Sequence, residues 1–517
     1  MRAPVSRNGL DVRWFSLLVA CSLLEACGPG PAATFGPHKV DIPVYPGRPS
    51  VSATTTSSSD APPSGHTKDA PFPAVARARL ANGMGIAVVT SRALPIVQLR
   101  VVVRVGAGFG PSPAVASITA DMLKDGGTRA YSSAELLRRI ETLGADLSIA
   151  TSSDATTLAM AVTKDHLGDA LSLLSQVVRE PRFDDGELKK LKARATDEAE
   201  DAARASGAWG ATRMVFRELF PERSTYATSG LVPSEIARVD GAAIRDLHRR
   251  FYVPKATSLV LAGDVDEATA KTMAEKAFGS WAGGDPPKVE PAAPRLPEKT
   301  RVIVVHRPKS AQSDVYVATL APRRRDPAWA SVRVANQVLG GGVAGRLFSD
   351  VREQRSLAYR TNTSIFEVAA TEQPLVAYAG TQTEKTSAAL AGLLENIEKM
   401  TTSPPTTAET FTARRFLSDT FAIRMETIGS IADMVATQDV LGLPDGYWDA
   451  YRRELRGIET AQAEQAAKQL FVKDRLLVVV AGDADVVAQD LARFGDVAVV
   501  DPEKEFKPMR TIPQVTK

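Results

Sequence analysis

Residues 257–264 read TSLVLAGD, and residues 476–483 read LLVVVAGD. Both are apolar runs that end in Ala-Gly-Asp, and their glycines, Gly263 and Gly482, lie 219 positions apart. A short apolar run bounded by glycine is typical of a buried strand. The same strand therefore occurs twice in one chain, which indicates an internal repeat.

A second pair of landmarks gives nearly the same spacing. Residues 122–127 read MLKDGG and residues 338–342 read VLGGG, which places Leu123 and Leu339 216 positions apart. Residues 284–300 contain five prolines, a composition typical of a connector between domains. The repeat predicts two homologous domains, residues 73–283 and 301–510, joined by the linker 284–300.

Each predicted domain mixes strands and helices. Apolar and polar residues alternate from Val97 to Val105, the period of a half-buried strand. Residues 132–135 (SSAE) resemble a capping box that opens a helix ending at Gly144, and 166–180 and 186–205 also read as helices. This order predicts an α+β fold in which helices pack on one face of a mostly antiparallel sheet.

The composition of the 517 residues limits the classes of function. Hydrophobic residues make up 44% and charged residues 24%, which is typical of a globular protein. The net charge of +3 argues against a nucleic-acid-binding protein, which usually carries a basic surplus. The two cysteines, Cys21 and Cys27, both precede residue 30, so we expect no internal disulfide framework in the folded body.

Residues 1–27 read as a secretory signal of the bacterial lipoprotein type. A basic start is followed by a short apolar stretch, residues 14–24, and then by a cysteine that would carry the lipid. We favour Cys27 over Cys21 as that cysteine, and a plain secreted precursor is the alternative. Residues 28–72 hold nine prolines and predict a disordered tether. We therefore expect a lipid-anchored protein of the cell envelope, on the periplasmic side of the outer membrane; the membrane face stays open.

Residues 75–505 resemble the pitrilysin or insulinase family of zinc peptidases, especially its mitochondrial-processing-peptidase-like members. The resemblance rests on the order and spacing of short landmarks: LANGM at 80–84, GAG at 106–108, FYVP at 251–254, Gln312-Ser313, Arg346-Leu347, and residues 352–359. It implies two homologous α+β domains that close like a clam shell around a chamber for peptides.

Active members of the family carry an H-x-x-E-H motif and a third ligand, a glutamate, some seventy residues later. Two imidazoles one helical turn apart face the same zinc, and the glutamate between them acts as general base. In this chain Ser117, Ala120 and Asp121 occupy the motif, and Glu198 stands 77 positions after Asp121, where the third ligand is expected. Glu198 is either a vestigial ligand or a solvated carboxylate.

No other set of histidines replaces the missing motif. His166, His248 and His306 are isolated in the sequence, and we expect each to be structural; no H-x-x-E-H or H-E-x-x-H occurs anywhere in the chain. The sequence therefore predicts that this chain binds no metal of its own and is not an autonomous peptidase.

The second domain keeps a different part of the family's site. Arg352 and Tyr359 match an arginine and a tyrosine that, in the family, reach across the chamber and bind the substrate carbonyl as it becomes an oxyanion. Both side chains are donors suited to developing negative charge. The alternatives are that Arg352 caps a helix or forms an ion pair and that Tyr359 is a half-buried aromatic of the sheet.

Three further features have simpler interpretations. Gly340, Gly341 and Gly342 resemble the family's flexible loop facing the substrate chamber, with a helix-terminal turn as the alternative. Residues 323–325, three arginines, are expected to form a solvated loop, with a phosphate or partner contact as the alternative. Asp264 and Asp483 follow buried strands and are expected to cap turns.

The leading hypothesis is a non-catalytic subunit of a two-chain, insulinase-like metallopeptidase. A zinc-bearing partner subunit would supply H-x-x-E-H, and this chain would supply Arg352 and Tyr359 in trans to the cleavage of peptides. One alternative is a peptide-binding or structural scaffold without chemistry, and a remote one is an autonomous metallopeptidase. The expected partners are thus the zinc-bearing subunit, peptide substrates and, through the lipid anchor, a membrane.

Overall fold

The computed structural model describes residues 70–109, 112–222 and 224–515, so the predicted signal and most of the predicted tether lie outside the described residues. The last residues of that tether belong to the folded body. Phe72 packs against Trp448 with ring centres 6.3 Å apart, and its N–H donates to Asp449 at 3.0 Å. Within the described residues, no helix is both long enough and apolar enough to span a bilayer.

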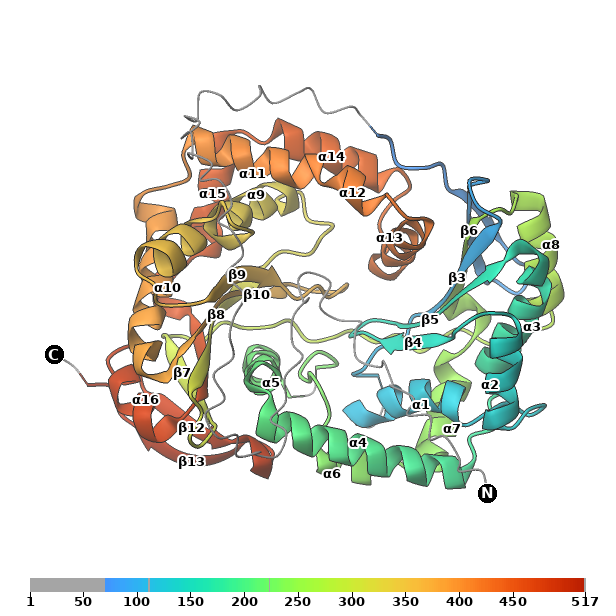
Figure 1. Cartoon of the computed structure of the whole chain (residues 1–517), viewed down its shortest axis with the longest axis horizontal. Helices are drawn as coiled ribbons and strands as arrows, with labels where there is room; N and C mark the ends of the chain where they lie inside the picture. The colour runs from blue at the N-terminus through green and yellow to red at the C-terminus, as the bar shows by residue number, and fades with distance from the viewer. Residues whose placement is uncertain (1–69, 110–111, 223, 516–517) are drawn as a thin grey trace, which may run out of the picture. The chain divides into compact units, whose positions relative to one another are not determined.

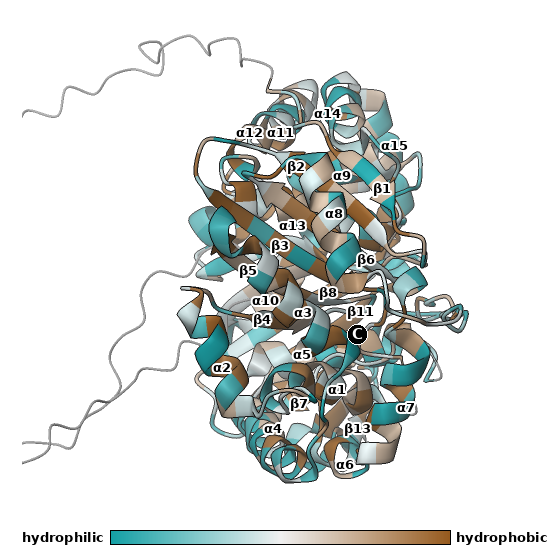
Figure 2. Ribbon diagram, turned by 90° about the vertical axis from the view of Figure 1, so that its right-hand side faces the viewer, coloured by the Kyte–Doolittle hydropathy of each residue, from teal (hydrophilic) through white to brown (hydrophobic). Residues whose placement is uncertain are grey.

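A six-stranded sheet forms the first half of the folded chain, in the order β1-β2-β6-β3-β5-β4. The β2–β6 pair is parallel and the other pairs are antiparallel. Along β3, residues such as Leu99 and Val101 pack into the core of the first half. Figure 2 shows hydrophobic and hydrophilic stretches along this strand in brown and teal. The strands are β1 (Ala76–Arg79), β2 (Gly85–Thr90), β3 (Ile96–Val103), β4 (Ser148–Thr151), β5 (Thr156–Thr163) and β6 (Thr257–Gly263).

A seven-stranded sheet forms the second half, in the order β13-β12-β7-β11-β8-β10-β9. Strand β7 pairs in parallel with β11 and β12, and the other pairs are antiparallel. The five strands from β7 to β9 repeat the order of β2 to β4 in the first sheet, which confirms the duplication. The strands are β7 (Arg301–His306), β8 (Gln312–Ala321), β9 (Arg360–Ile365), β10 (Gln373–Gln382), β11 (Leu477–Gly482), β12 (Val497–Asp501) and β13 (Lys507–Ile512).

The helices of the first half begin and end close to the predicted positions. Ser132 caps the second helix by accepting the N–H of Glu135 at 3.3 Å, and two long predicted helices are confirmed. The helices of this half are α1 (Pro113–Asp125), α2 (Ser133–Thr142), α3 (Leu167–Arg179), α4 (Asp185–Ala205), α5 (Gly207–Leu219), α6 (Pro233–Ala237), α7 (Gly241–Phe251) and α8 (Glu267–Phe278).

The second half repeats this helical order after a connector. Residues 279–300, all of them described, contain neither helix nor strand. The helices that follow are α9 (Trp329–Gly340), α10 (Thr386–Thr402), α11 (Thr407–Asp419), α12 (Phe421–Arg424), α13 (Ile428–Leu441), α14 (Tyr447–Gly457), α15 (Thr460–Leu470) and α16 (Ala484–Leu491). A π-helical segment, Phe348–Gln354, lies between α9 and β9.

The two halves exchange one helix each, which the sequence did not predict (Figure 1). Helix α5 of the first half packs Met214, Phe216 and Leu219 against the sheet of the second half, in one cluster with apolar residues of β7, β8 and β11. Helix α13 of the second half packs Ile431 and Val435 against β2, β3 and β6 in the same way. Burying such a side chain stabilises the fold by about 1.5–3 kcal/mol.

This exchange adds a helix to the predicted arrangement, in which helices cover one face of each sheet. Each sheet has helices of its own half on one face and a helix of the other half on the opposite face. An ion pair reinforces the contact of α13, since Arg100 on β3 lies 2.6 Å from Asp433. Neither half can therefore bury both faces of its sheet without the other.

Candidate functional site

Helix α1 carries the three positions where the sequence predicted a degenerate zinc motif. Ser117 and Asp121 lie four residues apart on one face of the helix, where a pair of histidines would share a metal. Ala120 is buried, Ser117 is half-buried and Asp121 is exposed. A hydroxyl and a carboxylate at these positions offer a far weaker zinc site than two imidazoles.

An arginine supplies the positive charge beside these positions. Arg194 on α4 lies 2.7 Å from a carboxylate oxygen of Asp125 on α1 and 3.8 Å from Glu198. The hydrogen bond to Asp125 raises the pKa of Arg194, and the charges of Glu198 and Asp121 add to this. The predicted third ligand thus pairs with a guanidinium, and the residues present do not fit a zinc ion.

Arg352 and Tyr359 lie close together in the structure, and their shared role stays a prediction. The guanidinium carbon of Arg352 lies 5.1 Å from the ring centre of Tyr359 and 4.6 Å from that of Phe348. Arg352 also pairs with Glu353 at 3.2 Å, so the alternative of an ion pair holds in part. A π-helical turn, which often marks a functional site, positions the arginine.

Tyr359 presents its side chain to solvent from an anchored backbone. Its N–H donates to the carbonyl of Gly380 on β10 at 3.1 Å, just before β9 begins at Arg360. The side chain is 78% exposed. The alternative of a half-buried sheet aromatic is therefore wrong, and the hydroxyl is accessible to a ligand.

A pocket of about 660 Å³ contains both residues. Its charged lining residues are Asp314, Arg352, Glu353, Arg360 and Lys385. At its inner side, Tyr378 donates to Asp314 at 2.8 Å. Burial, with the nearby charge of Asp314, raises the pKa of Tyr316 to about 12, so that tyrosine stays protonated at neutral pH. The volume is in the range of ligand sites, and the polar groups suit a peptide backbone.

The three glycines of the predicted substrate loop end helix α9. Gly340 is buried, and a Cβ there would lie 2.9 Å from Leu347 and 3.1 Å from the backbone of Thr363. A Cβ at Gly341 would lie 2.1 Å from the side chain of Gln337. Close packing thus explains these two glycines. Gly340, Gly341 and Gly342 are not among the residues that line the pocket of Arg352, and their role as a substrate loop stays a prediction.

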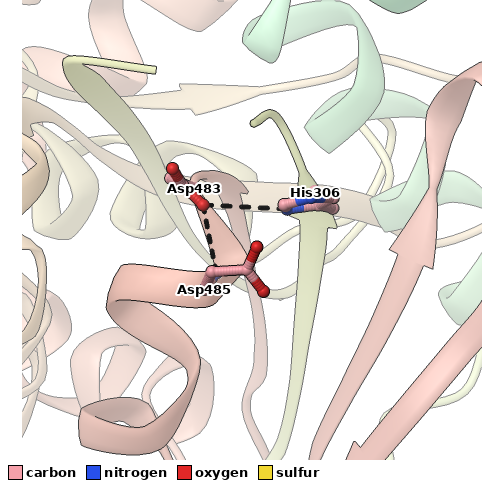
Figure 3. Close-up of side chains that lie close together, drawn as sticks. All are labelled: His306, Asp483 and Asp485. Carbon is pink, nitrogen blue, oxygen red and sulfur yellow. Dashed lines mark hydrogen bonds and ion pairs between the residues drawn. The ribbon is translucent and has the colours of Figure 1, made fainter. Parts of the chain in front are cut away.

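One cluster resembles a metal centre that the sequence did not predict. His306 at the end of β7 lies beside Asp483 and Asp485, which bound the start of α16 (Figure 3). Their possible ligand atoms lie within 4.8 Å of one another. The parallel pairing of β7 with β11 places His306 opposite Gly482 and so brings the three together.

Protein donors already occupy this cluster. His306 Nδ1 accepts the N–H of Ala484 at 3.1 Å, while Asp483 accepts the N–H groups of Asp485 at 3.1 Å and Lys309 at 2.7 Å. Asp485 accepts from Arg510 at 2.6 Å. The cluster is therefore a helix cap, which confirms the predicted capping role of Asp483.

The two other histidines within the described residues, His248 and His166, show no metal-site grouping. His248 Nε2 lies 2.8 Å from the carbonyl of Val178, and burial lowers the pKa of His248 to about 4. This histidine is therefore neutral and packed, between Phe183 and Tyr252. His166 is exposed at the start of α3.

Two smaller predictions need correction. Arg324, expected in a solvated loop, pairs with Glu367 and lies over the rings of Trp329 (5.6 Å) and Trp448 (5.4 Å). The exposed residues Arg323 and Arg325 on either side fit the prediction. Asp264 pairs with Lys164 at 2.9 Å, whereas Asp266 caps α8, because the turn after β6 is two residues longer than the turn after β11.

Comparisons with protein families identify the two halves. Residues 87–217 match the family model "Insulinase (Peptidase family M16)", and residues 238–417 match "Peptidase M16 inactive domain". An uncharacterized zinc protease of Bacillus subtilis, YmxG, is 22% identical over 68% of this chain and 85% of its own length. An uncharacterized zinc protease of Mycobacterium tuberculosis is 24% identical over 76% of this chain and 90% of its own length.

Solved structures share the fold. A peptidase M16 inactive domain from Pseudomonas fluorescens has a TM-score of 0.73 at 24% identity and covers 79% of this chain and 98% of its own. A protease from Helicobacter pylori has a TM-score of 0.70 at 17% identity, with 79% and 99% covered. At these identities the likeness concerns the fold alone.

Proposed function

Because the chain belongs to the peptidase M16 (insulinase) family while Ser117, Ala120 and Asp121 stand at its zinc motif, we propose that it is a non-catalytic subunit of a zinc metallopeptidase. The observation that carries this proposal is the pairing of Arg352 with Tyr359 in one solvent-open pocket. The chain retains donors for a substrate and lacks the side chains that hold the metal.

The role of the pair follows from its chemistry. A guanidinium presents five N–H donors in a plane, and a tyrosine hydroxyl adds a neutral donor. Both stabilise negative charge that develops on a carbonyl oxygen, and such donors act most strongly when their positions are fixed in advance. The π-helical turn and the bond from Tyr359 N–H to Gly380 fix the backbones of both residues.

The partner in this proposal is a second subunit of the same family that carries H-x-x-E-H. Zinc held by that subunit supplies the activated water. Arg352 and Tyr359 of this chain bind the peptide carbonyl from the facing side, and the polar pocket around them holds the neighbouring peptide backbone. The substrate class is an extended peptide.

Co-purification followed by an activity assay tests this function. The chain is captured from its native membrane, the eluate is analysed for subunit ratio, and cleavage of a quenched-fluorescence peptide is measured with and without a zinc chelator. We expect a family member with H-x-x-E-H at equal stoichiometry and cleavage that the chelator abolishes. Recovery of the chain without a zinc-bearing relative and without cleavage would favour a peptide-binding scaffold.

We also propose that a lipid on Cys27 anchors the chain to the cell envelope. The proposal rests on the basic, apolar and cysteine segments of residues 1–27 and on the proline-rich stretch that follows. Labelling with a radioactive fatty acid tests it. We expect Cys27→Ser to abolish the label and Cys21→Ser to retain it, and the reverse result would assign the anchor to Cys21.

A further inference from the structure

A second groove, of about 600 Å³, lies where the two halves of the chain meet. Strands β1, β2 and β6 of the first half form one wall, and residues 438–445 at the end of α13 form the other. Three arginines line it: Arg77, Arg79 and Arg104. This groove shares no residue with the pocket of Arg352.

One of the three arginines is neutralised within the chain. Arg77 lies 2.7 Å from Asp439 and 2.5 Å from Asp445, both on the opposite wall. These two ion pairs join β1 of the first half to the end of α13. They account for both acidic residues among those that line the groove.

The other two arginines, Arg79 and Arg104, each use only part of their N–H donors in hydrogen bonds within the described chain. Arg79 donates to the carbonyl of Gly83 at 2.7 Å, and Arg104 donates to the carbonyl of Lys255 at 2.6 Å. Among the described residues, neither has a carboxylate within ion-pair distance. Burial lowers the pKa of Arg104, and the charge of Arg79 adds to this, while Asp439 opposes it. The groove therefore holds two guanidinium groups that lack an anion.

Ser258 adds a buried hydroxyl to the lining of the same groove. Ser258 lines the groove, is 5% exposed, and has no hydrogen-bond partner for its Oγ among the described groups. It pairs with Val102 across β3 and β6, so it lies on the same sheet face as Arg104. A buried hydroxyl without a hydrogen-bond partner is energetically unfavourable, so a ligand that accepts from it would be favoured.

The residue beside this hydroxyl is a glycine. Gly85 on β2 pairs with Ser258, and a Cβ at that position would lie 3.3 Å from the Cβ of Ser258. A larger side chain would thus narrow the groove in front of Ser258. The site has the parts of an oxyanion cradle: two guanidinium groups, a hydroxyl and open space.

We propose that this groove binds an oxyanion, the phosphoryl or carboxylate group of a ligand, between Arg79 and Arg104 with Ser258 as a further donor. The anion belongs either to a soluble compound or to a lipid headgroup, which share the same chemistry at the site. The site is independent of peptide cleavage.

Isothermal titration of the purified full chain tests the site, with inorganic phosphate, pyrophosphate and citrate as probes. We expect saturable binding of at least one probe at one site, and a loss of affinity of about tenfold or more in Arg79→Gln and in Arg104→Gln. Arg104→Lys keeps the charge and should retain part of the affinity. Arg92→Gln, an equal loss of charge on an exposed residue that does not line the groove, is the matched control and should bind as the unaltered chain does.

A second arm distinguishes the source of the anion. The chain and its variants are sedimented with phosphatidylglycerol vesicles and with phosphatidylcholine vesicles. Preference for phosphatidylglycerol that is lost in Arg104→Gln, without binding of soluble probes, would assign the site to a lipid headgroup. Absence of saturable binding in both arms would overturn the proposal, as would binding that is equal in the arginine variants and in Arg92→Gln. Circular dichroism confirms that each variant is folded.

Discussion

Arg194 on α4 lies 2.7 Å from Asp125 on α1, and this pair occupies the side of α1 where the family would place its metal. The guanidinium of Arg194 interacts electrostatically with the nearby carboxylates of Asp121 and Glu198. The site in this chain therefore lacks imidazoles at positions 117 and 121 and holds a positive charge beside them. Like charges at short range repel, so the arginine alone disfavours a divalent cation.

Zinc binding by a restored motif tests this arrangement. We expect Ser117→His with Asp121→His, in the presence of Glu198, to bind zinc at least tenfold more tightly when Arg194 is also changed to Ala. Titration calorimetry with zinc measures the difference. Arg204→Ala, which removes an exposed arginine from the same helix, is the control. Equal affinity with and without Arg194 would show that the guanidinium does not oppose the metal.

The exchange of α5 and α13 predicts reciprocal effects of core substitutions. Met214→Ala on α5 and Ile431→Ala on α13 each remove a buried side chain and should cost about 2–4 kcal/mol. Hydrogen exchange should then rise in β8 and β11 of the second half for the first variant, and in β3 and β6 of the first half for the second. Exchange that rises only in the half carrying the substitution would contradict the exchange of helices.

Arg346 and Glu409 predict a specific loss of stability in acid. Two parallel contacts join them, at 2.7 and 2.8 Å, and Arg346 also donates to backbone carbonyls around residue 403. Despite burial, which opposes the effect, hydrogen bonds from Arg346 and Thr406 lower the pKa of Glu409 from 4.5 to about 2. A carboxyl group whose pKa is lower in the folded than in the unfolded state stabilises the fold at pH values above its unfolded-state pKa. This stability is lost as pH falls from about 4.5 to about 2.

Arg346→Met removes this contribution. We expect a cost of about 2 kcal/mol at neutral pH, less than for a fully buried pair because Glu409 is partly exposed. Urea unfolding over a pH series measures it, and the difference between the variant and the unaltered chain should shrink in acid. A cost that is independent of pH would assign the effect to packing alone.

Asp154 and Tyr226 predict the opposite pH dependence. Tyr226 donates to Asp154, whose other oxygen accepts the N–H of Ala369 in the second half at 3.0 Å. Burial raises the pKa of Asp154 above 3.8, although both hydrogen bonds oppose this. A carboxyl group whose pKa is higher in the folded state stabilises the fold at pH values below its unfolded-state pKa. This stability is lost as pH rises through its folded-state pKa.

Tyr226→Phe should therefore destabilise the chain more at neutral pH than in acid. At neutral pH the variant leaves a buried carboxylate with one donor fewer, at a cost of about 1–3 kcal/mol, whereas the protonated carboxyl in acid needs that donor less. Urea midpoints at the two pH values measure the difference. Tyr131→Phe, on a half-buried loop tyrosine that lies under Arg139, is the control. A larger loss of stability in acid than at neutral pH would contradict this prediction.

The sequence predicted the repeated units of the fold, because their signals are local. The apolar run ending at Gly263 and its copy at Gly482 are strands, and the Ser132 cap is set by a side chain three residues from its partner. The helix exchange was not predictable in this way. The apolar stripe of Ile431 and Val435 shows that α13 is buried, but it does not say against which sheet.

Only part of the candidate site could be predicted from the sequence. The resemblance to the family, carried by the order of short landmarks, implied Arg352 and Tyr359 as a pair seven residues apart. The pairing of Arg194 with Asp125 joins residues 69 positions apart on two helices, and no local pattern marks it. The exposure of Tyr359 and the burial of Arg324 likewise depend on tertiary packing, which reversed the local expectation for each.

The central claim is that this chain gives Arg352 and Tyr359 to the zinc site of another subunit. The most direct test is the single-turnover rate of peptide cleavage by the complex with its zinc-bearing partner, for the unaltered chain and for Arg352→Ala and Tyr359→Phe. Arg139→Ala with Tyr131→Phe is the matched control, since the guanidinium carbon of the exposed Arg139 lies 4.0 Å from the ring centre of the half-buried Tyr131. We predict a loss of about 10²- to 10³-fold for Arg352→Ala, a clear loss for Tyr359→Phe, an unchanged subunit ratio and no loss in the control. A complex that cleaves at the same rate with and without both substitutions would contradict the claim.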